Sequence, residues 1–268
     1  MEIRTTPETA LLDAIEAEGG VAPAAAAWGV AQSTIYHALS GEKKAGPRLL
    51  GALLGRRRIA GVIVLVSGAT RTFERFRGNP NFGRLKTPRN GNSVAAIAAC
   101  GHPWACDNDC FTGFREARFA RMLGQVSAAD RANLMWAAAP DVVGDCRATL
   151  ALFGEWRPRM AAMGLPVALV GQDGAEDADL PWGEMAALFL GGSTAWKLSA
   201  AAESLAAEAR ARGKLVHMGR VNSARRLRHA WEIGCHSVDG TCFSRWPDRY
   251  FPEALATLRG LRRQPSLF

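Results

Sequence analysis

The chain of 268 residues is 48% hydrophobic and carries a formal net charge of +8 with a pI near 9.6, which favours a polyanionic partner such as nucleic acid. No stretch approaches the roughly 18 consecutive apolar residues of a membrane span, and no basic-then-apolar leader opens the chain, so we expect a cytoplasmic protein with no membrane partner. Six scattered cysteines predict reduced thiols rather than a disulfide framework.

The first 58 residues predict a small helical domain. Its three helices are expected over residues 7–18, 22–28 and 32–39. Ala25, Gly29 and Ile35 stand at the offsets of a helix-turn-helix, which needs a small residue between the helices, a turn glycine and an apolar anchor. We therefore expect an all-α helix-turn-helix domain over residues 1–58; a small bundle for protein contacts is the alternative.

The second helix of this motif would present polar side chains to base edges and phosphates. They are Gln32, Ser33, Thr34, Tyr36 and His37. Basic residues that can neutralise phosphates follow them, namely Lys43, Lys44, Arg48 and Arg56 to Arg58. This order favours DNA as the partner of the domain.

Residues 59–268 alternate between apolar runs and helical stretches. Buried strands are predicted at 61–67, 134–137, 167–170, 187–190, 215–216 and 237–238, with a less defined one before Asp107. Helices are predicted over 114–123, 146–163, 196–212 and 224–233. Repeated βα units imply a parallel sheet, and about seven strands in about 200 residues favour a (β/α)8 barrel of the TIM type. A doubly wound open sheet is the alternative, although no GxGxxG or Walker A sequence supports it.

The segment from Arg71 to Asn92 is polar and rich in Pro and Gly, and we expect it to be a long surface loop. It carries six basic residues, among them Arg84, Lys86 and Arg89. A loop of this length inside a compact domain is uncommon unless it binds something.

Polar residues follow the predicted strands in a regular pattern. They are Asp107 to Asp109, Asp141 and Asp145, Gln172 to Gly174, Gly191 to Ser193, Met218-Gly219, and Asp239. In a barrel these strand ends meet at one mouth, so we expect them to line one site. Carboxylates, an amide and bare glycine backbone suit a purine-like base, which needs acceptors, donors and close backbone approach. For Asp239, a structural role as a cap of the next turn is the alternative.

Several of these segments resemble a known family. They are Asp107–Phe111, Ala139–Asp145, Val170–Gly174, Phe189–Gly192, Gly191–Lys197, Val216–Gly219, His217–Ser223 and Gly234–Asp239. In this order they resemble the strand ends of tRNA-guanine transglycosylases, and more closely the DpdA-like DNA-guanine transglycosylases of phages and bacteria. The resemblance covers residues 61 to 247 and implies exchange of guanine in DNA for a free 7-deazaguanine base.

The resemblance also implies roles for individual residues. Asp239 would be the nucleophile at C1′ of the target nucleoside, and Asp107 the general acid/base. Base binding falls to Asp145, Gln172, Gly191, Gly192, Met218 and Gly219. Lys197 stands where the tRNA enzymes have a Glu that suits an aminomethyl group, so a neutral base such as 7-cyano-7-deazaguanine is expected.

The chain also departs from the tRNA enzymes. Only Cys242 follows Asp239, so no structural zinc and no cofactor are expected. Three alternatives stay open: an enzyme acting on RNA, a barrel enzyme with Lys197 as a Schiff-base amine, and a DNA-binding regulator whose barrel senses a ligand. The Schiff base is disfavoured because Lys197 is expected to be exposed at a helix start. Partner proteins, whether accessory proteins or a second copy in a homodimer, are left open by the sequence.

A target base must leave the DNA stack before a barrel mouth can reach C1′. We expect Arg84, Lys86 and Arg89 of the polar loop to grip the phosphates beside the flipped nucleotide. Phe82 or Trp104 would fill the space that the base leaves.

Overall fold

The computed structural model describes residues 11, 15, 20–28, 30–40, 62–68 and 71–263. Internal contacts divide the chain into two compact units, residues 1–60 and 61–268. In the part of the chain that the structure describes, no helix is long and apolar enough to cross a membrane.

The N-terminal unit contains helices α2 (Val21–Trp28) and α3 (Gln32–Leu39), close to two of the predicted helices. Ile35 is fully buried and packs with Leu11, Ile15, Ala24 and Ala25. The side chains at 32, 33, 34 and 36 are exposed, as a surface that binds a partner requires. Gly29, Lys43, Lys44, Arg48, Arg56 to Arg58 and most of the first predicted helix lie outside the described residues, so the helix-turn-helix domain stays a prediction.

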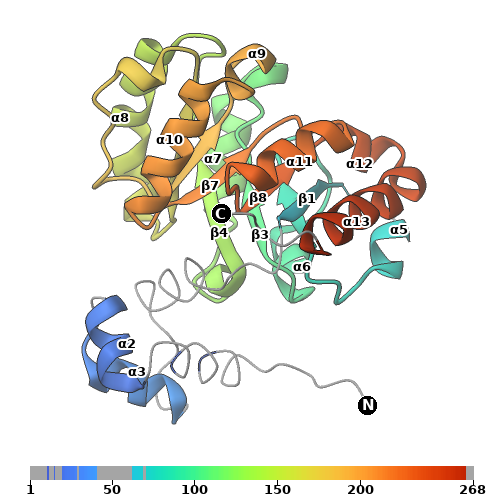
Figure 1. Ribbon diagram of the computed structural model, residues 1–268. Helices are drawn as coiled ribbons and strands as arrows, with labels where there is room; N and C mark the ends of the chain where they lie inside the picture. Colours follow the sequence, from blue (N-terminus) through green and yellow to red (C-terminus); the bar gives the residue numbers. More distant parts are fainter. Residues whose placement is uncertain are drawn as a thin grey trace. The chain divides into compact units, whose positions relative to one another are not determined.

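The second unit is a closed barrel of eight parallel strands in chain order, which confirms the predicted TIM-type fold (Figure 1). The strands are β1 Ile63–Ser67, β2 Phe82–Lys86, β3 Trp104–Cys106, β4 Leu134–Ala138, β5 Val167–Gly171, β6 Ala187–Leu190, β7 Leu215–Met218 and β8 Ser237–Asp239. β8 pairs with β1 and closes the sheet, with Asp239 beside Leu65. The alternative of an open doubly wound sheet is therefore wrong.

Helices surround the strands (Figure 1). They are α5 Arg71–Arg75, α6 Val94–Ala99, α7 Glu116–Gly124, α8 Cys146–Ala162, α9 Thr194–Lys197, α10 Ala200–Ala211, α11 Ala224–Glu232, α12 Thr241–Arg245 and α13 Pro247–Arg263. Short 3-10 turns occur at Cys110–Thr112, Ala129–Asn133 and Ala175–Asp177. The main core lies between these helices and the outward faces of the strands, where Val64, Phe82, Leu188 and Val216 are fully buried.

The segment from Arg71 to Asn92 is not the surface loop that its composition predicts. It contains α5 and the barrel strand β2, which pairs with β1 and β3. Gly83 has no room for a side chain, because a Cβ there would lie 2.5 Å from the carbonyl oxygen of Pro103 and 2.7 Å from Leu65 Cδ2. The sequence predicts seven strands, and β2 is the one that it does not predict.

The predicted phosphate clamp is therefore wrong. Arg84 is buried with its guanidinium 4.4 Å from the centre of the Phe73 ring, and Lys86 is buried with its ammonium bonded to Asn90. Arg89 is exposed but ties its loop to the next one, since its backbone N–H donates to Asp109 Oδ2 at 3.1 Å. Phe82 and Trp104 are fully buried, so neither can replace a flipped base.

Candidate active site

All eight strands contribute a residue from their carboxyl ends to one pocket. In chain order these residues are Ser67, Thr87, Asp107, Asp141, Gln172, Gly191, Gly219 and Asp239. The pocket has a volume of about 210 Å³ and lies where the catalytic loops of TIM barrels emerge. The structure thus brings Asp107, Gln172, Gly191, Gly219 and Asp239 together, as the strand-end pattern predicts.

Asp239 is the last residue of β8 and is held from two sides. His217 Nε2 lies 3.1 Å from its Oδ2, and the backbone N–H of Arg220 donates to its Oδ1 at 3.0 Å. The other ring nitrogen of His217 lies 2.9 Å from Ser237 Oγ. The carboxylate is therefore fixed in place while its side chain keeps 16% of its surface exposed at the pocket.

The surroundings favour the ionised form of Asp239. Burial acts to raise the pKa of this carboxyl, but the hydrogen bond from His217, the N–H of Arg220 and the cation of Lys197 outweigh it, so the pKa is lowered. Hydrogen bonds to a carboxylate stabilise its charged form. Asp239 is thus an anion over the whole neutral range.

Asp107 has the opposite character. It follows β3, its backbone N–H donates to the carbonyl of Lys86, and its Oδ1 accepts a hydrogen bond from the N–H of Asn108. Burial, together with the charges of Asp239 and Asp109, raises its pKa well above the usual value. Two neighbouring carboxyl groups with pKa values pushed apart are the arrangement from which acid and nucleophile roles arise.

Asp141 lies at the centre of a hydrogen-bond network in the same pocket. Asn108 Nδ2 donates to its Oδ1 and Gln172 Nε2 donates to its Oδ2, both at 2.7 Å. Gln172 Oε1 in turn accepts from the N–H of Gly144 at 3.0 Å. Burial raises the pKa of Asp141, with these hydrogen bonds acting in the other direction. The network sets a carboxylate and an amide edge to edge, which suits a planar ligand with both donors and acceptors.

Two glycines let the backbone form the pocket wall. A Cβ at Gly191 would lie 2.4 Å from Val170 Cγ1, and one at Gly219 would lie 2.5 Å from the ring of Phe189. Real Cβ atoms do not come this close, so both positions require glycine. Bare backbone at these strand ends lets a flat ligand approach closely.

An aromatic residue, Phe111, lies at the rim of the pocket, where the sequence does not predict one. Phe111 is 62% exposed, and the guanidinium of Arg220 lies 4.3 Å from the centre of its ring. Arg220 has a left-handed backbone with φ of 60° and donates to the carbonyl of Gly191 at 2.6 Å. Non-glycine residues in that region cluster at functional sites. An exposed ring beside a cation gives a flat ligand a surface on which to stack.

Four residues expected in the pocket lie elsewhere. Asp145 is exposed and caps α8, where its side chain accepts from the N–H of Ala148. Met218 faces the helices in the outer core, and Gly192 packs against Asp173 and Trp196. None of these three lines the pocket. Asp141, four residues before the cap, occupies the position expected for Asp145, because the loop after β4 continues beyond it before α8 begins.

Lys197, the fourth, is buried rather than exposed as predicted. Its ammonium donates to the carbonyl of Gly219 at 2.7 Å. Burial, with the nearby charge of Arg220, lowers the pKa of Lys197 to about 8. The residue supports the Gly219 turn from behind and does not line the pocket, so it gives no reason to prefer a neutral base.

Comparisons with known proteins add little to this site. No protein-family model and no curated protein gives a significant match. Among solved structures, one described as native KDPGal is 15% identical with a TM-score of 0.48, over 75% of this chain and 94% of that one. An oxaloacetate acetylhydrolase bound to oxalate is 15% identical with a TM-score of 0.43, over 81% and 88%. A putative lyase/mutase from Burkholderia cenocepacia is 15% identical with a TM-score of 0.38, over 80% and 90%. Likenesses this remote say nothing about activity.

The residues of the pocket themselves indicate its chemistry. All six cysteines are free thiols, and in the described part of the chain no group of three or more His, Cys, Asp or Glu could hold a metal ion. The pocket offers a fixed carboxylate at Asp239, a second acid at Asp107 whose pKa is raised, and a polar wall for a flat ring. A carboxylate and a carboxylic acid at one centre suit displacement at a sugar carbon with an oxocarbenium-like transition state.

Proposed function

We propose that this chain exchanges guanine in DNA for a 7-deazaguanine base through a covalent intermediate on Asp239. The observation that carries the proposal is that one pocket holds Asp239, fixed by His217 and Arg220 with its pKa lowered, and Asp107, whose pKa is raised. An ionised carboxylate can attack C1′, and a protonated one can supply the proton that a leaving base needs. The resemblance in motif order points to the same reaction.

The exchange takes place in two steps. An oxygen of Asp239 bonds to C1′ as the C1′–N9 bond breaks, and the electron pair leaves with guanine, which takes a proton from Asp107. The incoming base gives its ring N–H proton back to Asp107, and its nitrogen attacks C1′. The bond between C1′ and Asp239 then breaks, and the carboxylate is restored. The acid and the nucleophile each end in their starting state.

Recognition of the base is assigned to Asp141 and Gln172. Guanine presents N–H donors on one edge and a carbonyl oxygen next to them, so it needs an anionic acceptor beside an amide donor. Asp141 and Gln172 are already joined at 2.7 Å, and a bound base would exchange that contact for contacts of its own. The backbone at Gly191 and Gly219 completes the wall.

Phe111 and Arg220, at the rim of the pocket, can compensate for the stacking that a base loses when it leaves the duplex. A base that reaches this pocket has left the stack of the duplex, which costs a few kcal/mol. Phe111 offers the extruded base a replacement stacking surface, strengthened by the cation of Arg220. Base–aromatic stacking of about 1–3 kcal/mol offsets much of that cost.

The Schiff-base alternative has one observation in its favour, the buried Lys197 with a lowered pKa. However, its nitrogen is bonded to the carbonyl of Gly219 behind the pocket wall, so a carbonyl substrate in the pocket would not meet it. If the chain were only a ligand-sensing regulator, the opposite pKa shifts of Asp239 and Asp107 would have no function. Exchange chemistry uses both.

The test is incorporation of labelled base. The full chain is incubated with guanine-containing duplex DNA, a matched RNA duplex, and radiolabelled 7-cyano- or 7-aminomethyl-7-deazaguanine. We expect label in the DNA and a covalent protein–DNA adduct by mass spectrometry. Asp239→Asn should abolish both, by a factor on the order of 10⁴ in rate. Label in RNA alone would select the RNA enzyme, and binding of free base without exchange would select the regulator. Incorporation by Asp239→Asn at the wild-type rate would refute the nucleophile.

A further inference from the structure

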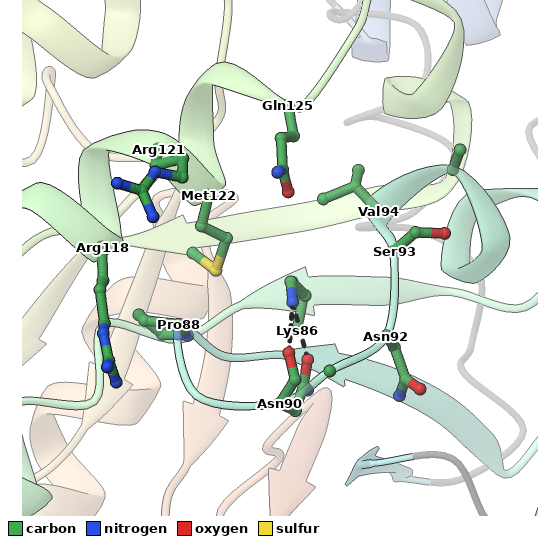
Figure 2. Close-up of a pocket in the computed structure, with 12 residues that line it drawn as sticks. Lys86, Pro88, Asn90, Asn92, Ser93, Val94, Arg118, Arg121, Met122 and Gln125 are labelled. Carbon is green, nitrogen blue, oxygen red and sulfur yellow. Dashed lines mark hydrogen bonds between the residues drawn. The ribbon is translucent and has the colours of Figure 1, made fainter.

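A second pocket lies beside the strand-end pocket, between the loop after β2 and helix α7 (Figure 2). Its volume is about 550 Å³, within the range of sites that take a small molecule. The residues that matter for its chemistry are Lys86, Pro88, Val94, Arg118, Arg121 and Met122. Neither the sequence motifs nor the proposed chemistry uses Arg118, Arg121 or Met122.

The pocket is built for an anion. Arg118 and Arg121 are exposed and three residues apart on α7, so they project on one face of the helix. Within the described part of the chain neither guanidinium has an ion pair or hydrogen-bond partner, and no Asp or Glu lines the pocket. Two unpaired cations facing a cavity with no acid attract a negatively charged group.

A third cation approaches from the opposite wall. Lys86 is buried at the end of β2, and its ammonium donates to the backbone carbonyl and to Oδ1 of Asn90, at 2.8 and 2.9 Å (Figure 2). An ammonium has three N–H donors, so one is left for a ligand. Its position is fixed by Asn90, which means that little side-chain entropy is lost when it binds an anion.

The rest of the lining mixes apolar residues with polar side chains, namely Asn90, Asn92, Ser93 and Gln125. Met122 and Val94 are buried side chains that face the pocket from α7 and α6, and Pro88 lies between Lys86 and Arg118 (Figure 2). Such a surface suits a ring rather than a bare inorganic ion. An anion joined to a flat ring is the chemistry of a nucleotide.

The loop after β2 contributes residues to both pockets. Thr87 lines the strand-end pocket, while its neighbours Lys86 and Pro88 line this one. The next residue, Arg89, bonds to Asp109, which itself lines the strand-end pocket. Because the same loop borders both pockets, a polynucleotide is a ligand that can occupy both.

We propose that this pocket binds the nucleotide next to the one that reacts, with its phosphate on Arg118, Arg121 and Lys86 and its base against Met122 and Val94. The identity of the ligand as part of the substrate strand rests on the proposed function; the preference for a nucleotide anion does not. The site replaces the loop clamp that the sequence predicted, and of those residues it keeps only Lys86.

Binding is tested first, without any chemistry. A short single-stranded DNA lacking guanine is titrated into the full chain at several salt concentrations, with fluorescence anisotropy as the readout. Arg118→Ala/Arg121→Ala should weaken binding about tenfold or more, and should reduce the slope of log affinity against log salt by roughly 0.7 per lost phosphate contact. Arg118→Lys/Arg121→Lys should keep most of the slope. The matched control is Arg212→Ala/Arg259→Ala, which removes the same charge from exposed positions near the far ends of α10 and α13.

The second measurement places the site on the strand. Target strands carry one neutral methylphosphonate linkage, either just before or just after the reacting guanine, and exchange is followed. One of the two linkages should slow the wild type about tenfold, with little further effect on Arg118→Ala/Arg121→Ala. Free nucleoside monophosphate should compete only weakly, because it lacks the anchored neighbour.

The outcomes separate this proposal from the proposed function. If the Arg118/Arg121 variant binds DNA with the affinity and slope of the Arg212/Arg259 control, this site is refuted, even if exchange is observed. If binding depends on Arg118 and Arg121 but the wild type never exchanges guanine, the site stands as a nucleotide site and the transglycosylase assignment fails. Equal effects of both methylphosphonates on wild type and variant would refute the placement beside the reacting nucleotide.

Discussion

His217 holds Asp239 from inside the barrel, with its Nε2 atom 3.1 Å from the carboxylate. Burial lowers the pKa of His217, so the ring is neutral and carries one proton. Because Asp239 is an anion that only accepts, that proton is on Nε2, and Ser237 donates its hydroxyl hydrogen to Nδ1 at 2.9 Å. The chain Ser237–His217–Asp239 therefore fixes both the position and the charge of the candidate nucleophile.

Replacing His217 tests this arrangement. His217→Phe keeps a ring against Trp136 and Phe189, whose centres lie 4.6 and 4.4 Å away, but removes the donor. We expect the exchange rate to fall about 10- to 100-fold, the value of a charge-assisted hydrogen bond. The acid limb of the pH–rate profile should move to higher pH, because burial then raises the pKa of Asp239 with less opposition.

His217→Gln supplies the control, since its amide N–H can restore part of the hydrogen bond. It should recover part of the rate and bring the acid limb back down. A uniform loss of rate at every pH in both variants would instead show that the histidine acts only through packing.

The raised pKa of Asp107 predicts that replacing this residue increases the stability of the protein and decreases its activity. Its folded pKa is raised, so between the unfolded value near 3.9 and the raised one the folded state binds more protons than the unfolded state. Stability then falls as the pH rises through that window. Asp107→Asn, which never ionises, should have a higher melting temperature than the wild type at pH 7, and the gain should vanish near pH 4.

The same variant should lose exchange, because nothing accepts the ring proton of the incoming base. A protein–DNA adduct through Asp239 should still be detected by mass spectrometry but should form more slowly, because water must then supply the proton that the leaving guanine takes from Asp107. An unchanged melting temperature at pH 7 would mean that Asp107 is ionised in the folded state, and the acid role would then be untenable.

Asp141 and Asp145 form a matched pair of carboxylates in one loop. Asp141→Asn removes the anion that faces the pocket, and we expect the KM for free 7-deazaguanine to rise at least about tenfold. Asp145→Ala removes the cap of α8 and should cost about 1 kcal/mol of stability with exchange intact. Steady-state exchange kinetics and chemical denaturation of both variants give the comparison. The reverse result would return the base-binding role to Asp145.

Most of the barrel could be predicted because its strands are buried apolar runs of the right length. β2 could not, because its outward positions include Arg84 and Lys86, and its inward Gly83 gives no apolar signal. Arg84 is buried in the core, where it stacks on Phe73, a contact between separate elements. Propensity along the chain cannot reveal such a contact.

The site was predictable where a residue directly follows a strand, as Asp107 and Gln172 do, because the strand end fixes its position. The site was not predictable where contacts between distant segments decide which residue lines the pocket. Asp141 and Asp145 both follow β4, and only the start of α8 separates them. His217 stands inside a strand and reads as one polar residue in an apolar run, although its spacing of two residues from Gly219 places it on the inward face.

The exposed face of α3 is a candidate surface for reading base edges. Gln32, Ser33 and Tyr36 are exposed around the buried Ile35, and none of them is a cation. If α3 reads base edges, replacing all three by Ala should weaken duplex binding by about 1–3 kcal/mol for each base pair no longer read, and by different amounts on different sequences. The salt slope should stay the same, because no counterion-releasing residue is lost. That distinguishes this variant from Arg118→Ala/Arg121→Ala, which should reduce the slope on any sequence.

Anisotropy titrations on two unrelated duplexes, with Ala22→Ser/Ala26→Ser on the exposed face of α2 as control, give both the affinity and the salt slope. Equal binding by the triple variant and the control would mean that α3 does not touch DNA, and a protein-contact role for the N-terminal unit would follow.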